Sequence, residues 1–351
     1  MVVPRILTPL DVNPPTGAVQ HITVRGSDWL WAVFCIFIVF DLGFMAWMLC
    51  VPRGKRLFHQ IAVMILTLTA LTYFSQASNL GWTVTRTQFG HYTVAGTWRQ
   101  IWWCRYVNWI LTLPLLLVEI TLASALPLSD IVILAFAGGF IWANLLVGAL
   151  VQSSYKWGYY TFACVSMLYM WWVLIMPARK SAKVLRGDYH IIATVSAVWI
   201  SFMYALYAVC WACCEGANVV SNDSEMVWYG ILDILTKPCF LFYFLAALTD
   251  CDLAVLQLNS GKYTESGINR STAATGEVVG DVEKSREPAV ESPPLTKSFP
   301  GRGQHDVIPD TADTTVPTEQ PTTVTTPPAT AAQHTEPRYS GATLEGDVGH
   351  H

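Results

Sequence analysis

The hydrophobic pattern divides the chain into seven long apolar stretches followed by a polar C-terminal segment. A helix needs about 20 predominantly apolar residues to cross the hydrocarbon core of a bilayer, and each stretch has this length. The joins between the stretches are short. The pattern therefore predicts an all-α membrane protein, a bundle of seven transmembrane helices. The stretches run near residues 29–51, 57–80, 101–124, 130–151, 157–176, 189–213 and 226–248.

The remaining segments differ in character. The longest join, from Gly81 to Gln100, alternates Thr and Val around a central Phe-Gly-His, which is typical of a β-hairpin outside the bilayer. Beyond about Leu256 the sequence is rich in Pro, Thr, Gly, Ser and charge, and it cannot bury enough apolar area to become ordered. We expect an extracellular N-terminal segment at 1–28, a helical domain at 29–250 and a disordered cytoplasmic tail at 251–351.

Lysine and arginine are divided unevenly between the two sets of joins. Because basic residues concentrate on the cytoplasmic side of a membrane protein, the N-terminus is predicted outside and the C-terminus in the cytoplasm. We expect an integral protein of the plasma membrane. The basic set contains Arg53, Lys55, Arg56, Arg179, Lys180, Lys183 and Arg186, whereas the opposite set contains only Arg86, Arg99 and Lys156.

Composition narrows the class further. The chain is 53% hydrophobic and only 13% charged, against about 25% charged residues in ordinary soluble domains. A net charge of −4 without a clustered basic face argues against nucleic-acid binding. Cys210 and Cys213 have a CxxC spacing, but no second ligand pair exists and the motif lies in an apolar stretch. We expect these cysteines to pack in the core, and we expect neither a metal site nor enzyme activity.

The informative signal is charge at membrane depth, which costs at least about 2.5–3.5 kcal/mol at the centre of a helix. Lys237 lies midway along the seventh stretch, and Asp233 is four residues earlier on the same helical face. A lysine condensed with an aldehyde as a Schiff base would serve as an electronic handle on a cofactor. A structural Lys–Asp pair facing a polar bundle interior explains these two residues equally well.

The third stretch adds Arg105 and Glu119, about 21 Å apart along a helix and so near opposite membrane faces. Arg105 can extend outward or pair with Asp233. Burial favours the protonated form of Glu119, which makes it a candidate proton donor, although a neutral acid bonded to a neighbouring helix is the alternative. For Asp41 in the first stretch we expect a helix–helix hydrogen bond.

Three segments resemble a known family. The stretch from Arg105 through Asn108 and Trp109 to Glu119 resembles the third helix of microbial (type 1) rhodopsins. Asp233 to Lys237 is similar to their seventh-helix Asp-x-x-x-Lys signature, and the run 153–160 resembles the fungal opsin branch. The resemblance covers about residues 27–250.

The resemblance implies a role for each matching residue. Lys237 would carry all-trans retinal as a protonated Schiff base, with Asp233 as one counterion and Arg105 nearby. Tyr73 would donate a hydrogen bond to that counterion. Glu119 occupies the position of the cytoplasmic proton donor. The remaining matches are the pocket residues Trp109, Tyr204, Tyr207 and Trp211, the gate residues Asn108 and Thr112, and the extracellular proton-release candidates Glu215 and Glu225.

The departures from the family pattern bear on mechanism. The proton-acceptor position, an Asp in the family's proton pumps, is Asn108 here, and an amide cannot accept and hold a proton. Tyr204 stands where the family has a Trp over the retinal, and Ala208 replaces its Pro.

Three classes of function are compatible with this pattern. The missing acceptor favours a photoreceptor that signals to a cytoplasmic partner through its loops or tail. Glu119, Glu215 and Glu225 favour a light-driven proton pump, and Asn108 with Thr112 resembles a chloride-pumping pattern. Tyr204 and Ala208 favour a non-photoactive, chaperone-like opsin relative. We expect retinal and the lipid bilayer as partners, and homo-oligomers are compatible with the family.

Overall fold

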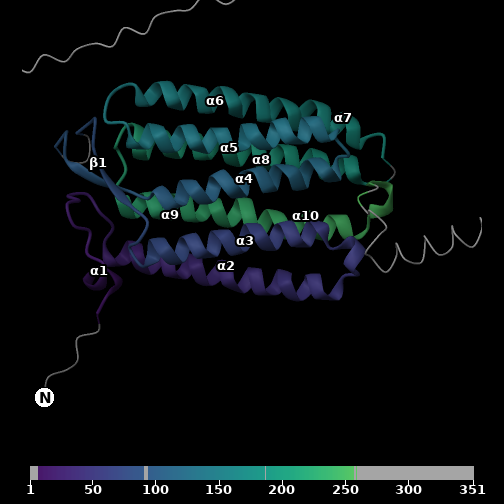
Figure 1. Cartoon of the computed structure of the whole chain (residues 1–351), viewed down its shortest axis with the longest axis horizontal. Helices are drawn as coiled ribbons and strands as arrows, with labels where there is room; N and C mark the ends of the chain where they lie inside the picture. The colour runs from purple at the N-terminus through teal and green to yellow at the C-terminus, as the bar shows by residue number, and fades with distance from the viewer. Residues whose placement is uncertain (1–6, 91–93, 186, 257, 259–351) are drawn as a thin grey trace, which may run out of the picture. The chain divides into compact units, whose positions relative to one another are not determined.

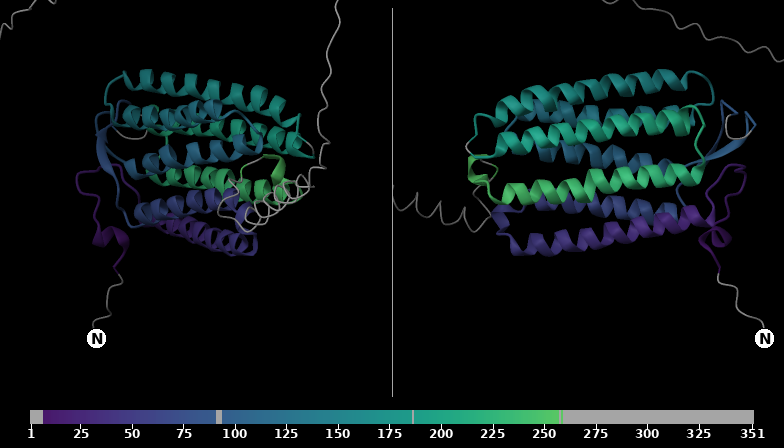
Figure 2. Two further views of the ribbon diagram at one scale, coloured as in Figure 1. Left: turned by 45° about the vertical axis from the view of Figure 1, so that its right-hand side comes forward. Right: turned by 180° about the vertical axis from the view of Figure 1, so that it is seen from behind.

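The computed structural model describes residues 7–90, 94–185, 187–256 and 258. Seven membrane helices lie side by side with roughly parallel axes (Figures 1 and 2). Each is long and apolar enough to cross a membrane, which confirms the predicted seven-helix bundle. Three of the seven contain a π-helical turn. The spans are α2 (Val24–Cys50), α3 (Leu57–Ala77), α4 (Trp103–Ala123), α5 (Leu128–Leu150), α6 (Lys156–Val173) continued by η2 (Leu174–Ala178) and α7 (Arg179–Ala182), α8 (Tyr189–Trp211) with η3 (Ala212–Gly216), and α9 (Asn222–Ile234) with η4 (Leu235–Cys239) and α10 (Phe240–Thr249).

Several helices extend beyond the apolar stretches that predict them. Helix α2 begins at Val24 rather than near residue 29, and its first turns contain the polar Arg25 and Asp28. Helix α9 begins at Asn222, where the Ser221 hydroxyl accepts a hydrogen bond from the backbone N–H of Ser224. Hydrophobicity marks the part of a helix inside the bilayer, whereas the helix itself ends where its backbone groups find a cap.

The π-helical turn η4 contains Lys237, directly before Pro238. Proline has no backbone N–H and its ring disturbs the regular α-helical pattern of hydrogen bonds, so a local change of helix type at this point is expected. Pro177 lies in the π-helical turn η2 in the same way. The seventh helix is therefore irregular at its candidate functional lysine.

One end of the bundle, which we call the hairpin end, carries the predicted β-hairpin. Strands β1 (Thr83–Arg86) and β2 (Trp98–Ile101) pair antiparallel, with Thr83 opposite Ile101. The N-terminal segment lies along β2, since the backbone N–H of Gln20 donates to Trp98. It also contains the short helix α1 (Pro9–Val12). Gly81 leads into β1 with φ +78°, and a Cβ there would lie 2.7 Å from Cys104.

The opposite end, which we call the α10 end, carries the joins α2–α3 and α7–α8 and the end of α10. Order continues past the expected boundary at residue 250, because a 3₁₀-helix, η5, covers Leu253–Leu256. The rest of the expected tail, 259–351 and residue 257, lies outside the described residues. Within the bundle, the Thr67 hydroxyl donates to Asp41 at 2.9 Å, which joins α3 to α2 by the expected type of hydrogen bond.

Large apolar side chains such as Val39, Phe136 and Phe162 point outward, while charged side chains are buried between the helices. This arrangement suits a lipid surround, in which the solvent is apolar and the polar groups must find partners inside the protein.

Candidate functional site

The candidate site is centred on an ion pair between Lys237 in η4 and Asp233 in α9. Both side chains are buried, and the ammonium donates to Oδ1 of Asp233. The four-residue spacing predicts this contact, because residues i and i+4 lie on one face of a helix. In the part of the chain that the structure describes, no other carboxylate contacts Lys237.

Three further donors fix the carboxylate of Asp233. The hydroxyl of Tyr73 donates to Oδ2 at 2.7 Å, as the resemblance implies. The indole N–H of Trp109 donates to Oδ1 at 2.9 Å, and the Tyr207 hydroxyl donates to the same oxygen. Helices α3, α4 and α8 thus all bond to one carboxylate. Hydrogen bonds to an ionised acceptor are about twice as strong as neutral ones, so these donors hold the Asp233 carboxylate firmly in position.

Aromatic rings form the wall beside this ion pair. Trp109 lies 4.0 Å from Trp142 and 5.5 Å from Tyr207, measured between ring centroids. Tyr204 lies 5.3 Å from Tyr207 and 6.3 Å from Trp142. Trp142 in α5 is absent from the sequence-based candidates, because it stands in an apolar run where nothing distinguishes one face from another. Its contacts place it in the same cluster as the expected residues.

Trp211, another expected pocket residue, makes its contacts elsewhere. Its indole N–H donates to the Leu145 carbonyl at 3.2 Å, and its ring stacks on Tyr160. Gly148 leaves room for that ring, since a Cβ there would lie 3.1 Å from it. Trp211 therefore joins α8 to α5 and α6, through residues other than the aromatic rings beside the ion pair.

Asn108 and Thr112 give α4 a neutral polar face. Both are buried one turn apart. The Thr69 hydroxyl donates to Oδ1 of Asn108 at 3.4 Å, whereas the Asn108 amide Nδ2 has no partner among the described residues. A buried amide donor without a partner is costly, so it marks a place where another acceptor would be stabilised.

A second cluster of charges lies near the hairpin end. Arg105 bonds to Glu225 at 2.7 Å and lies 3.7 Å from Glu215. The alternative that Arg105 pairs with Asp233 is therefore wrong, because the two glutamates offer it closer partners. The hydroxyls of Tyr106 and Tyr229 donate to Glu215 at 2.6 and 3.0 Å. The two expected proton-release candidates thus lie in one network.

The sequence gives no sign that Arg99 belongs to this network, since it stands in the hairpin among residues expected outside the bilayer. Its guanidinium, only 1% exposed, bonds to the second oxygen of Glu225 at 2.7 Å. It also donates to Gln20 and to the carbonyl of Val220. Burial alone would lower the pKa of Arg99, but Glu225 outweighs this and raises the pKa above its ordinary value. Arg99 therefore stays cationic, and Glu225 is held between two guanidinium groups.

Arg99→Gln is expected to destabilise the protein by about 3 kcal/mol, the lower limit for removing one partner of a buried ion pair, because Arg105 still contacts Glu225. The stabilisation by Arg99 is complete below the ordinary arginine pKa and is lost only as the pH rises through the raised pKa of the folded state, so it should not vary between pH 5 and 9. Thermal unfolding in detergent measures the loss. Arg86→Gln is the control, because Arg86 is an exposed hairpin residue lying over Trp98. Equal melting temperatures for Arg99→Gln and the native chain would contradict the assignment.

Glu119 lies in the half of α4 that leads to the α10 end. Its side chain is fully buried, and neither carboxylate oxygen has a hydrogen-bond partner among the described residues. This favours the uncharged acid over an ionised one, because an ionised carboxylate at that depth requires a cation or several donors. Glu119 and the Asn108 turn are about 16 Å apart along the helix.

Comparison with known proteins agrees with this architecture. Residues 26–251 match the family model described as bacteriorhodopsin-like protein. The chain is 48% identical over 256 residues to Protein FDD123 of Trametes versicolor, covering 73% of this chain and 89% of that protein. It is 39% identical over 237 residues to the opsin-like protein carO of Fusarium fujikuroi, covering 66% and 77%.

Among solved structures, the light-driven proton pump CsR of Coccomyxa subellipsoidea superposes with a TM-score of 0.63 at 27% sequence identity. The match covers 66% of this chain and all of that one. The family model, the fungal relatives and the solved structure all point to the same family. The chain belongs to the bacteriorhodopsin-like family: it is a fungal type 1 rhodopsin, an integral membrane protein of seven helices from a family whose chromophore is retinal.

Proposed function

We propose that this protein binds all-trans retinal on Lys237 and works as a photoreceptor with impaired outward proton pumping. One observation carries the second half of the proposal: the side chain at the family's proton-acceptor position is the amide of Asn108, and Asp233 is the only carboxylate on Lys237 within the described residues. A signal to a partner would leave through the loops at the α10 end or through the tail.

The residues around Lys237 suit the proposed cofactor. A buried primary amine can condense with the aldehyde of retinal, releasing one water, and the bound polyene would supply light absorption and isomerisation. Asp233 would balance the resulting positive charge, and the bonds from Tyr73, Trp109 and Tyr207 keep it in place. The rings of Trp109, Trp142 and Tyr204 offer an apolar, water-excluding wall.

Impaired pumping follows from the chemistry of the side chains. An outward pump needs a group on the outward side of Lys237 that takes up a proton and keeps it. The amide of Asn108 cannot do so, and the Asp233 carboxylate already accepts hydrogen bonds from four donors. Glu225 is fixed between Arg99 and Arg105. The chain still has the other two groups that a pump would use. Glu119 is the candidate proton donor, and Glu215, which accepts hydrogen bonds from two tyrosines, is a candidate release group.

For orientation, we propose that the α10 end faces the cytoplasm and that the protein resides in the plasma membrane. The joins at that end carry the larger set of lysines and arginines. At the hairpin end, Arg99 and Lys156 are buried with partners rather than exposed: Lys156 donates to the carbonyl of Glu215 at 2.9 Å.

A light-driven chloride pump is the second candidate. The neutral pair Asn108 and Thr112 removes the carboxylate that would repel an anion, and the free Nδ2 of Asn108 points to a site that can accept one. An anion there would act as a second counterion to Lys237.

Light-induced pH change in a suspension of cells that express the full chain with added retinal separates these functions. We expect a visible pigment but no sustained acidification of the medium, with or without a protonophore. A robust acidification that the protonophore abolishes would overturn the photoreceptor assignment. A visible band that shifts with chloride, together with passive proton uptake enhanced by the protonophore, would establish the chloride pump instead.

A further inference from the structure

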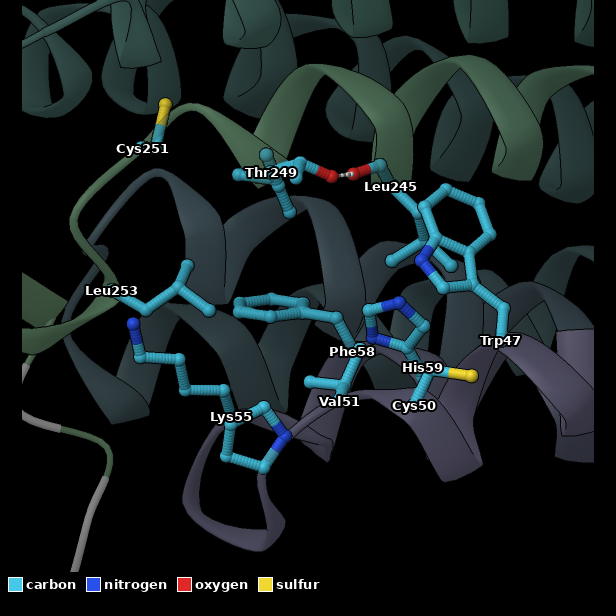
Figure 3. A pocket seen from close by; sticks show the side chains of 12 residues that line it. Trp47, Cys50, Val51, Lys55, Phe58, His59, Leu245, Thr249, Cys251 and Leu253 are labelled. Carbon is cyan, nitrogen blue, oxygen red and sulfur yellow. Dashed lines mark hydrogen bonds between the residues drawn. The ribbon is translucent and has the colours of Figure 1, made fainter. Parts of the chain in front are cut away.

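A cavity of about 250 Å³ opens at the α10 end, far from the candidate retinal site. Its walls come from the end of α2, the start of α3 and the segment that ends α10 (Figure 3). Most of the wall is apolar, with Trp47, Phe58 and Leu245 prominent. None of the residues proposed above to bind retinal or move protons lines it.

Two basic side chains belong to this cavity. His59 is buried, with 8% of its surface exposed, and its ring makes an edge contact with Trp47. Neither ring nitrogen has a hydrogen-bond partner among the described residues, although a neutral imidazole always has one N–H to donate. Lys55 is exposed at the rim, with its ammonium near Leu253 in Figure 3. Asp250 and Asp252 belong to the segment that follows α10, but neither side chain lines the cavity. The polar part of the cavity therefore suits an anion.

An apolar groove on the outer face of the bundle borders this cavity at Trp47, which lines both. The groove has a volume of about 240 Å³ and shares Trp47 with the cavity. Its other walls are Val39, Phe40, Gly43 and Phe44 of α2 and Phe242 of α10. Space is free at Gly43, since a Cβ there would meet no atom within 4 Å, so a large side chain at this position would extend into the groove.

The combined dimensions match one lipid leaflet. From Val39 to Cys50, where α2 ends, the helix rises about 16 Å, close to half of the roughly 30 Å hydrocarbon core. In a bilayer spanned by α2, the apolar groove would face the acyl chains, while Lys55 and His59 would lie nearer the headgroups, where tryptophans also concentrate. Basic sites between helices on the cytoplasmic side attract anionic lipids.

We propose that the groove and cavity together bind one anionic phospholipid of the surrounding leaflet. Its phosphate contacts Lys55 and the N–H of His59, and one acyl chain runs past Trp47 and over Gly43. The choice of an anionic lipid rests on the proposed cytoplasmic orientation of the α10 end. The site does not depend on retinal binding, so loss of lipid retention and loss of pigment are distinguishable results.

Native mass spectrometry of the full-length protein in detergent tests this site. The probe is an equimolar mixture of phosphatidylglycerol and phosphatidylcholine with identical acyl chains. We expect one phosphatidylglycerol to be retained in preference, and Lys55→Gln to reduce its retention about fivefold. Lys180→Gln removes an exposed charge from the same end and should change nothing. Gly43→Leu should reduce retention of both lipids, whereas Gly158→Leu, also at an open glycine, should not.

A second measurement locates the acyl chain. Phosphatidylglycerol brominated on its acyl chain should quench the tryptophan fluorescence of the native protein more than that of the Trp47→Phe variant. The reason is that Trp47 lines both the cavity and the groove. Equal retention of the two lipids, or equal losses in the Lys55 variant and its Lys180 control, would overturn the proposal. Retention of added oleate in place of the phospholipid would overturn it as well. An unchanged temperature of thermal unfolding in detergent for every variant shows that the protein is folded.

Discussion

Asp233→Asn is expected to lower the pH at which the retinal pigment loses its visible band by about 3 pH units. The reason is that Asp233 is the only carboxylate contacting Lys237 among the described residues, and the other side chains bonded to Asp233 are neutral donors. The substitution leaves a buried cation without a compensating charge, which costs several kcal/mol. Tyr73, Trp109 and Tyr207 also lose an ionised acceptor. Absorbance titration of the purified pigment measures the shift.

Asp28→Asn is the matched control for this prediction, because Asp28 is an exposed acid in the first turns of α2. Its titration should coincide with that of the native protein. If Asp233→Asn also coincided with the native curve, Asp233 would not be the counterion, and another anion would have to balance Lys237.

Asn108→Asp is expected to shift the same midpoint in the opposite direction, upward by about 1–3 pH units. The variant keeps the volume of the side chain and adds a second carboxylate on the α4 side of the site. It also supplies the proton acceptor that the native chain lacks, so we expect it to acidify the medium in light where the native protein does not. The two measurements are the absorbance titration and the light-induced pH change.

Asn144→Asp separates a local effect from the general effect of a buried acid. Asn144 is buried in α5, where its amide donates to the Phe140 carbonyl. Its replacement should leave the titration unchanged. An unchanged titration in Asn108→Asp itself would remove Asn108 from the counterion region and, with it, the physical basis for impaired pumping.

The sequence predicts the bundle well because bilayer thickness imposes one length on every apolar stretch. It also predicts that Asp233 and Lys237 meet, since both lie on one helix and their spacing fixes their relative position. The alternation of Thr and Val between Gly81 and Gln100 predicts the hairpin formed by β1 and β2. These are local properties, which a single sequence contains.

Contacts between segments that are distant in the sequence are harder to predict. Arg99 and Glu225 are 126 residues apart in sequence, and no local pattern shows that a hairpin arginine folds into the interior. The wrong expectation that Arg105 could pair with Asp233 has the same origin. Glu215 and Glu225 are also within its reach in the folded protein, and only the packing of the helices decides among the three acids. Trp142 is hidden for another reason: in an unbroken apolar run, the face that points inward has no polar contrast.

The most direct test of the central claim is to identify the atom that carries the chromophore. Purified protein reconstituted with all-trans retinal should form a visible pigment, and borohydride reduction should then leave the added mass on the peptide containing Lys237. Lys237→Ala should give neither the band nor the modified peptide. Native protein that stays colourless at every pH, with no added mass on Lys237, would contradict the account.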